Sequence, residues 1–243
     1  NYRKNKDERI KYYKDKNLKF VIDEFAKENN LKVIMHFPHS SLEAPDSFWK
    51  DVNIDKEYFN RINLKMSDVL LLELFKDWEY KKIIAPYSRL YVDVEKYWDE
   101  EKEIMAKKGM GAVYTKDLFL NILHKKRQEF MKEAKIYYDE HHERLSAACD
   151  CQQDVLIIDV HSFGEEMARL VTNKKTLPDI CLGVNDDNSR CDILLEQIKF
   201  WCKSNGVRYR INYPYKGSIL PNKTNSKNKI YSLMLEINKR YYL

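Results

Sequence analysis

The segment Val155–Val160 constrains the fold most, because it is almost entirely apolar and branched and leads directly into His161. A run without polar alternation indicates a strand buried on both faces of a parallel sheet. A second apolar strand at 31–37 leads in the same way into His39. Because ligands of open α/β sheets gather at the carboxyl ends of the strands, we expect both imidazoles at one site.

The composition excludes several classes of protein. The 243 residues suffice for one large domain, and the net charge of +5 comes from interleaved charges rather than a basic patch, which argues against a nucleic-acid partner. No apolar run approaches the ~20 residues of a transmembrane helix, and the first residues do not resemble a secretory signal. Five cysteines without a CxxC motif predict reduced thiols in a cytoplasmic protein.

Apolar strands alternate with amphipathic segments, which predicts an α/β fold with a mixed, mostly parallel central sheet flanked by helices. We expect a charged, helical N-terminal extension at 1–30, packed on a single domain at 31–243. The expected strands lie at 31–37, 82–86, 90–94, 112–114, 155–160, within 178–183, and at 207–212 and 231–238. The expected helices lie at 56–77, at 116–149 after an N-cap at Thr115, and from a cap at 186–189 to about 204.

His39 and His161 are candidate metal ligands, since neutral imidazole is the commonest ligand of zinc and catalytic zinc takes three protein ligands. A carboxylate is the expected third ligand. Glu43 follows His39 in the same loop, and Asp68 begins the apolar half of the helix expected at 56–77. The sequence leaves both open, because either acid can equally be solvated.

Glu236 lies between apolar residues of the last expected strand. A buried carboxylate is costly unless it is paired or used, so this position predicts a general base for an activated water. On an edge strand, Glu236 would simply face solvent.

Three further segments carry candidate groups. Arg89 suits bidentate binding of a carboxylate, and Asp93 shares its face in an unbroken strand, although the two can also form an internal salt bridge. Of His141 and His142, about 100° apart on a helix, one is expected to face the site. Lys216 can reach the site from a loop or remain solvated.

Nine short motifs together resemble the N-formylglutamate amidohydrolase family. They run in order from about residue 32 to the end of the chain. The matching blocks are 38–41, 66–68, 88–95, 109–115, 137–142, 158–163, 178–183, 214–218 and 235–242.

The resemblance implies a zinc-carboxypeptidase-like architecture with one Zn²⁺ per chain, or another divalent metal. It implies that His39 and His161 bind the metal and that Glu236 is the general base. Carboxypeptidases carry a glutamate three residues after the first histidine, where this chain has Leu42. Under this resemblance Asp68, which lies in the matching block 66–68, is the preferred third ligand and Glu43 the second choice.

The implied reaction is hydrolysis of the amide bond of an N-acylated acidic amino acid, foremost N-formylglutamate to formate and glutamate. Arg89 would hold a substrate carboxylate, with Asp93 and Lys216 grouped with it as substrate-binding residues. His142 would donate a hydrogen bond to the developing oxyanion. The alternatives are a carboxypeptidase or amidase with a wider cleft for peptides, and a binding protein without metal. The oligomeric state is not predicted.

Overall fold

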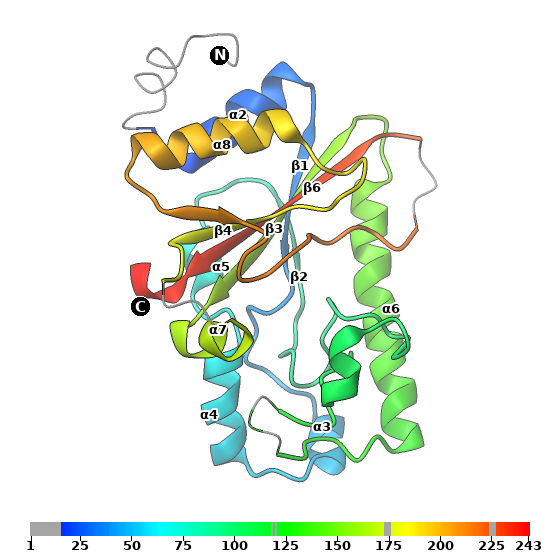
Figure 1. Cartoon of the computed structure of the whole chain (residues 1–243). Helices are drawn as coiled ribbons and strands as arrows, with labels where there is room; N and C mark the ends of the chain where they lie inside the picture. Colours follow the sequence, from blue (N-terminus) through cyan, green and yellow to red (C-terminus); the bar gives the residue numbers. More distant parts are fainter. Residues whose placement is uncertain (1–15, 118, 120, 173–175, 224–226) are drawn as a thin grey trace.

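The computed structural model describes residues 16–117, 119, 121–172, 176–223 and 227–243. Its centre is a six-stranded sheet in the order β2-β1-β3-β6-β4-β5 (Figure 1). The strands are β1 (Lys32–Phe37), β2 (Lys81–Ile84), β3 (Val155–Phe163), β4 (Ile180–Gly183), β5 (Tyr209–Ile211) and β6 (Ile230–Asn238). The four strands from β2 to β6 are parallel, whereas β4 is antiparallel to β6 and parallel to β5. The predicted α/β class and mostly parallel sheet are confirmed.

Helices cover both faces of this sheet. The helices are α2 (Leu18–Glu28), α3 (Asp46–Asp51), α4 (Lys56–Met66), α5 (Leu71–Leu74), α6 (Gln128–Cys149), α7 (Glu165–Val171) and α8 (Asp192–Ser204), with 3₁₀ turns η1 (Ile104–Lys108) and η2 (Lys239–Tyr241). Figure 1 shows α2 beside α8 on one side of the sheet and the long α6 on the other. In the described part of the chain, no helix is long and apolar enough to span a membrane.

Alternation along the strands decides which side chains meet the site. Val33, Met35 and Phe37 of β1 enter the core formed with α2 and α8, and so do the corresponding alternate residues of β3 and β6. The intervening residues point to the face covered by α6, where Ile34 and Ile157 pack against Leu145. His36, Asp159, His161 and Glu236 follow this second alternation, so the central strands present their polar side chains on one face.

A second apolar core lies beside the sheet, among α3, α4, the connection at 85–123 and the first half of α6. Its fully buried members include Phe48, Tyr91 and Tyr114. This core supports the loops that approach the carboxyl ends of β1 and β3.

Helix α2 is an integral part of the fold. Val21, Ile22 and Phe25 are at most 2 % exposed and belong to the main core. Residues 1–15 of the predicted extension lie outside the described residues, and the boundary at residue 30 stays a prediction.

The helix predicted at 56–77 is broken, which changes the setting of Asp68. Helix α4 ends at Met66, Ser67 is extended, and Leu70 has a φ of 61° before the short α5 begins. Asp68 therefore lies in a loop and not on a helix, and the buried Ser67–Asp68 pair turns inward.

The predictions for 90–94, 112–114 and 116–149 are also wrong in part. The first two segments form turns and an isolated bridge between Met110 and Tyr114, although their apolar residues are buried as a strand would require. The long helix begins at Gln128 and not after Thr115. Burial by the second core, rather than pairing in a sheet, accounts for the apolar pattern of these segments.

Candidate functional site

Three side chains from separate segments converge at the carboxyl ends of the central strands. His39 follows β1, His161 belongs to β3, and Asp68 comes from the loop between α4 and α5. Asp68 Oδ2 lies 3.3 Å from His161 Nδ1 and 3.8 Å from His39 Nδ1. All three residues are at most 5 % exposed, and their ligand atoms lie within 4.8 Å of one another.

Several contacts aim Asp68 at the two imidazoles. Its backbone N–H donates to the carbonyl of His39 at 2.8 Å, and its Oδ1 accepts from Ser162 Oγ at 2.9 Å. The buried Lys239 donates to the carbonyl of the preceding Ser67 at 2.6 Å. Burial acts to raise the pKa of Asp68, but the nearby imidazole of His161, with the charges of His39 and Lys239, lowers it overall.

The atoms of this group that lack a hydrogen-bond partner among the described residues are suited to binding a divalent cation. His39 Nδ1 and Asp68 Oδ2 are buried and have no hydrogen-bond partner among the described residues. A buried polar atom without a partner is costly, and here two such atoms face each other beside His161 Nδ1. Two imidazoles and a carboxylate form a donor set typical of catalytic zinc.

The opposite nitrogen of His39 is held by Asp93. His39 Nε2 lies 2.8 Å from Asp93 Oδ1, and Arg89 Nη2 and the Tyr114 hydroxyl donate to Oδ2 at 2.7 and 2.6 Å. Burial, followed by the charge of Arg89, lowers the pKa of His39, so the ring is neutral as a metal ligand must be. Asp93 is fully buried and engaged with these neighbours, which leaves it unsuited to the predicted substrate contact.

Arg89 and Asp93 meet through a turn and not through a strand. The side chain of Arg89 is 21 % exposed, and Nη1 also donates to the carbonyl of Met66 at 3.2 Å. The internal salt bridge, one of the two expectations, is therefore present, while the guanidinium keeps some access to solvent.

Glu236 lies directly beside His161, its register partner between β3 and β6. Strand β6 is flanked by β3 and β4, so the alternative of an edge strand is wrong. Burial raises the pKa of Glu236 to about 8, with a smaller contribution from the charge of Asp68 and opposition from His161. A carboxyl group with this pKa is suited to accepting and releasing a proton near neutral pH.

A second group of acids and imidazoles lies behind His161. His161 Nε2 is 3.1 Å from Asp159 Oδ1 and 3.3 Å from Glu95 Oε2. Asp159 Oδ1 also lies 2.8 Å from His36 Nδ1, and Glu95 Oε1 lies 3.4 Å from the same nitrogen. Sequence reasoning missed these three residues, although His36 and Asp159 interrupt buried strands just as Glu236 does.

The two adjacent histidines of α6 have different partners. His141 Nε2 lies 2.9 Å from His36 Nε2, so His141 joins the second group. His142 Nε2 lies 2.9 Å from the carbonyl of Val94. This carbonyl must receive the Nε2 proton, so neutral His142 presents Nδ1 as an acceptor, the opposite of the donor that an oxyanion needs.

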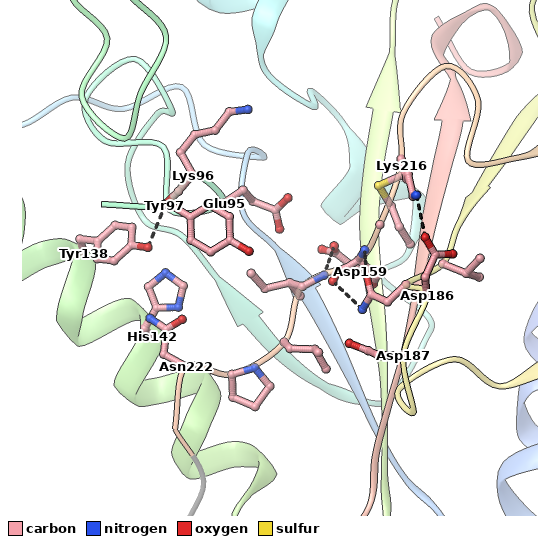
Figure 2. A pocket seen from close by; sticks show the side chains of 18 residues that line it. Glu95, Lys96, Tyr97, Tyr138, His142, Asp159, Asp186, Asp187, Lys216 and Asn222 are labelled. Atoms are coloured by element: carbon pink, nitrogen blue, oxygen red, sulfur yellow. Dashed lines mark hydrogen bonds and ion pairs between the residues drawn. The ribbon is translucent and has the colours of Figure 1, made fainter. Parts of the chain in front are cut away.

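A cavity of about 650 Å³ opens beside the second group. Figure 2 shows Glu95, Tyr97 and His142 on one wall, and Lys216 with its partner Asp186 on the other. Lys216 is paired with Asp186 at 2.7 Å and is well exposed. Glu95 and Asp159 line the cavity and also contact His161, so they connect it to the metal-ligand candidates. Glu43 is exposed and is not in the convergent group.

Comparisons with known proteins place this geometry in context. A family model described as N-formylglutamate amidohydrolase matches residues 31–243. The fold is similar to the crystal structure of N-formylglutamate amidohydrolase from Ralstonia eutropha JMP134, with a TM-score of 0.72 and 19 % identity over 88 % of this chain and 84 % of that chain. No curated protein matches the sequence.

Proposed function

Because the chain belongs to the N-formylglutamate amidohydrolase family and is therefore a hydrolase of amide bonds, we propose that it uses zinc to cleave N-formylglutamate into formate and glutamate. The observation that carries the proposal is the pair of buried atoms His39 Nδ1 and Asp68 Oδ2, which have no hydrogen-bond partner within the described ranges and lie beside His161 and Glu236.

His39 Nδ1, Asp68 Oδ2 and His161 Nδ1 would hold the metal. When bound, zinc supplies Lewis-acid polarisation of a carbonyl and lowers the pKa of a water toward ~7. The carboxylates around His161 raise its pKa although burial opposes this, so metal must displace a proton from the ring. Metal uptake is therefore expected to release protons and to weaken at low pH.

Glu236 moves the proton of the reaction. Its carboxylate takes a proton from the attacking water and passes it to the nitrogen of the leaving amine. Burial raises the pKa of Glu236. A bound divalent cation would lower this pKa again, so that the carboxylate could act as a general base near neutral pH.

The partners of the ligands act as positioning residues. Asp93 holds Nε2 of His39, and Asp159 accepts from Nε2 of His161, so both rings turn Nδ1 toward Asp68, where the metal would be held. Such carboxylate contacts to histidine ligands fix the tautomer and the ring orientation.

Substrate binding rests on the cations near the site. Arg89 pairs with Asp93, but its side chain is partly exposed, and we assign the guanidinium to a substrate carboxylate. Lys216 lines the cavity and is paired with Asp186. In this proposal it releases Asp186 and binds the substrate instead. We expect Arg89→Ala to raise KM for acidic substrates, and an unchanged KM would argue against this role.

The cavity favours a second candidate, an amidase acting on peptides through the same residues. Its volume of about 650 Å³ matches pockets that enclose ligands much larger than a small dicarboxylate. Its walls carry acids such as Asp187 as well as lysines.

A hydrolysis screen tests both candidates. Purified protein is assayed on N-formyl and N-acetyl amino acids and on short peptides, with zinc and with a chelator, while zinc content is measured. The proposal predicts about one zinc per chain and chelator-sensitive release of formate from N-formylglutamate. Preferential cleavage of peptides would select the second candidate, and failure to take up zinc would favour a metal-free binding protein.

We also propose, from the reduced cysteines, that the protein is cytoplasmic; all five are free thiols.

A further inference from the structure

A chain of hydrogen bonds runs from His161 through Asp159 to the surface, and beyond Asp159 it passes through residues that the proposed mechanism does not use. It passes from His161 Nε2 to Asp159 Oδ1, on to His36 Nδ1, and from His36 Nε2 to His141 Nε2. The outer end is Arg144, whose Nη2 lies 3.3 Å from His141 Nδ1. His36 and His141 are fully buried, whereas Arg144 is exposed.

The two ends of this chain fix the direction of every hydrogen bond in it. An ionised carboxylate only accepts and a guanidinium only donates. Both oxygens of Asp159 face nitrogen atoms, because Oδ2 accepts from the backbone N–H of Ile219 and Oδ1 lies 2.8 Å from His36 Nδ1. His36 must therefore carry its proton on Nδ1, which leaves Nε2 as an acceptor.

The outer end leads to the same assignment independently. Arg144 donates to His141 Nδ1, so His141 carries its proton on Nε2 and donates it to His36 Nε2. Burial, with the charge of His36, lowers the pKa of His141 to about 2, so this ring stays neutral. With either ring in the other tautomer, two acceptors or two donors would face each other in the core.

This series of hydrogen bonds therefore determines how His161, the proposed metal ligand, is held. Asp159 Oδ2 is already occupied by the backbone N–H of Ile219 at 3.0 Å, and Oδ1 accepts from His36. A carboxyl group held in this way stays in place and accepts the Nε2 proton of His161, whose Nδ1 faces Asp68.

We propose that His36 and His141 are positioning residues that, with Asp159 and Arg144, fix His161 in the tautomer that binds metal. This inference rests on the proposed function, since it requires His161 to be a ligand. It also explains why His36, Glu95 and Asp159 lie together without a second metal ion. The Nδ1 proton of His36 is already hydrogen-bonded to Asp159 Oδ1, and this oxygen is shared with His161 Nε2.

Nitrogen-15 NMR of the histidine rings in the zinc-loaded wild-type protein tests the inference without any substitution. We expect a proton on Nδ1 of His36, on Nε2 of His141 and on Nε2 of His161. A proton on Nε2 of His36, or a doubly protonated His36, would overturn the proposal, and so would two zinc ions bound per chain.

Substitution of His141 tests the effect on the metal. His141→Leu removes the donor to His36, and we expect zinc affinity, measured by chelator competition, to fall by no more than about 10-fold, the low end for direct partners of metal ligands, because His141 acts through His36 and Asp159. His141→Gln keeps an amide donor and should restore most of the affinity. Glu143→Gln, an exposed change on the same helix, is the matched control.

The outcomes separate the two proposals. Full zinc affinity in folded His141→Leu would refute the positioning role and leave the zinc site intact, whereas absence of zinc from the wild type would refute the proposed function itself. If His141→Leu does not fold, the wild-type NMR assignment and the His141→Gln affinity still decide, because a clear loss of zinc affinity in His141→Gln relative to Glu143→Gln would contradict rescue by a donor.

Discussion

Two groups with nearly the same composition lie on opposite sides of the His161 ring, and they differ in what their atoms already bind. In the group of His39, Asp68 and His161, two buried atoms have no partner in the described part of the chain. In the group of His36, Glu95 and Asp159, Glu95 Oε1 is the only buried atom without a hydrogen-bond partner among the described residues, and the imidazole proton goes to a carboxylate. The comparison teaches that unsatisfied electron pairs, rather than residue types, distinguish a candidate metal site from a supporting network.

The largest expected effect is a difference in zinc content between two variants, each with one residue of one group substituted. His161→Ala should abolish stoichiometric zinc, because two ligands remain of the three that a catalytic site needs. Glu95→Gln should keep about one zinc per chain. Metal analysis of the two purified variants decides, and equal loss of zinc in both would erase the distinction between the groups.

Glu236→Gln should retain zinc and lose activity. Removal of a general base typically costs 10²–10⁴-fold, so we expect about this reduction in kcat. Zinc content and the melting temperature serve as controls for the integrity of the site. Turnover close to that of the wild type would rule out Glu236 as the base.

Asp93→Asn should have a smaller effect on the first group. Asn at position 93 keeps the shape but weakens the contact with His39 Nε2 and with Arg89, so zinc affinity should fall by about 10–100-fold. Chelator competition measures the affinity. A change limited to KM would instead support the substrate-binding role predicted from the sequence.

The smallest expected effect is a dependence of stability on pH in the metal-free protein. Glu236 has a pKa of about 8 in the folded chain and an ordinary value of 4.5, so between these values the folded state binds more protons than the unfolded state. The free energy of unfolding should therefore decrease as the pH rises from 5 to 8. Urea unfolding with chelator should show a weaker decrease in Glu236→Gln, and identical slopes would argue against the raised pKa.

Much of the sheet could be predicted because its strands are short apolar runs. The segments 31–37, 155–160 and 231–238 lie within or close to β1, β3 and β6. The connection at 85–123 could not be predicted in the same way. Its apolar residues, such as Leu90 and Val92, are buried by a second core that exists only after distant segments meet.

The same contrast applies to the site. His39, His161 and Glu236 could be found because each interrupts or follows a buried strand, and the choice of Asp68 over Glu43 required the family resemblance. Asp159 carried the same signal as Glu236, a charge inside an apolar run, and was overlooked. Glu95 gave no local signal, since its role depends on how the turn at 88–95 folds against β3.

The three candidate ligands are contributed by segments that are distant in the chain. In the proposed zinc-bound form, the ion joins the end of β1, the loop after α4 and the end of β3 by direct bonds. A ligand that binds only the folded state adds about 4 kcal/mol at a thousandfold excess over its Kd. The supply of zinc would therefore govern how long the folded enzyme persists in a cell, and not only how fast it turns over.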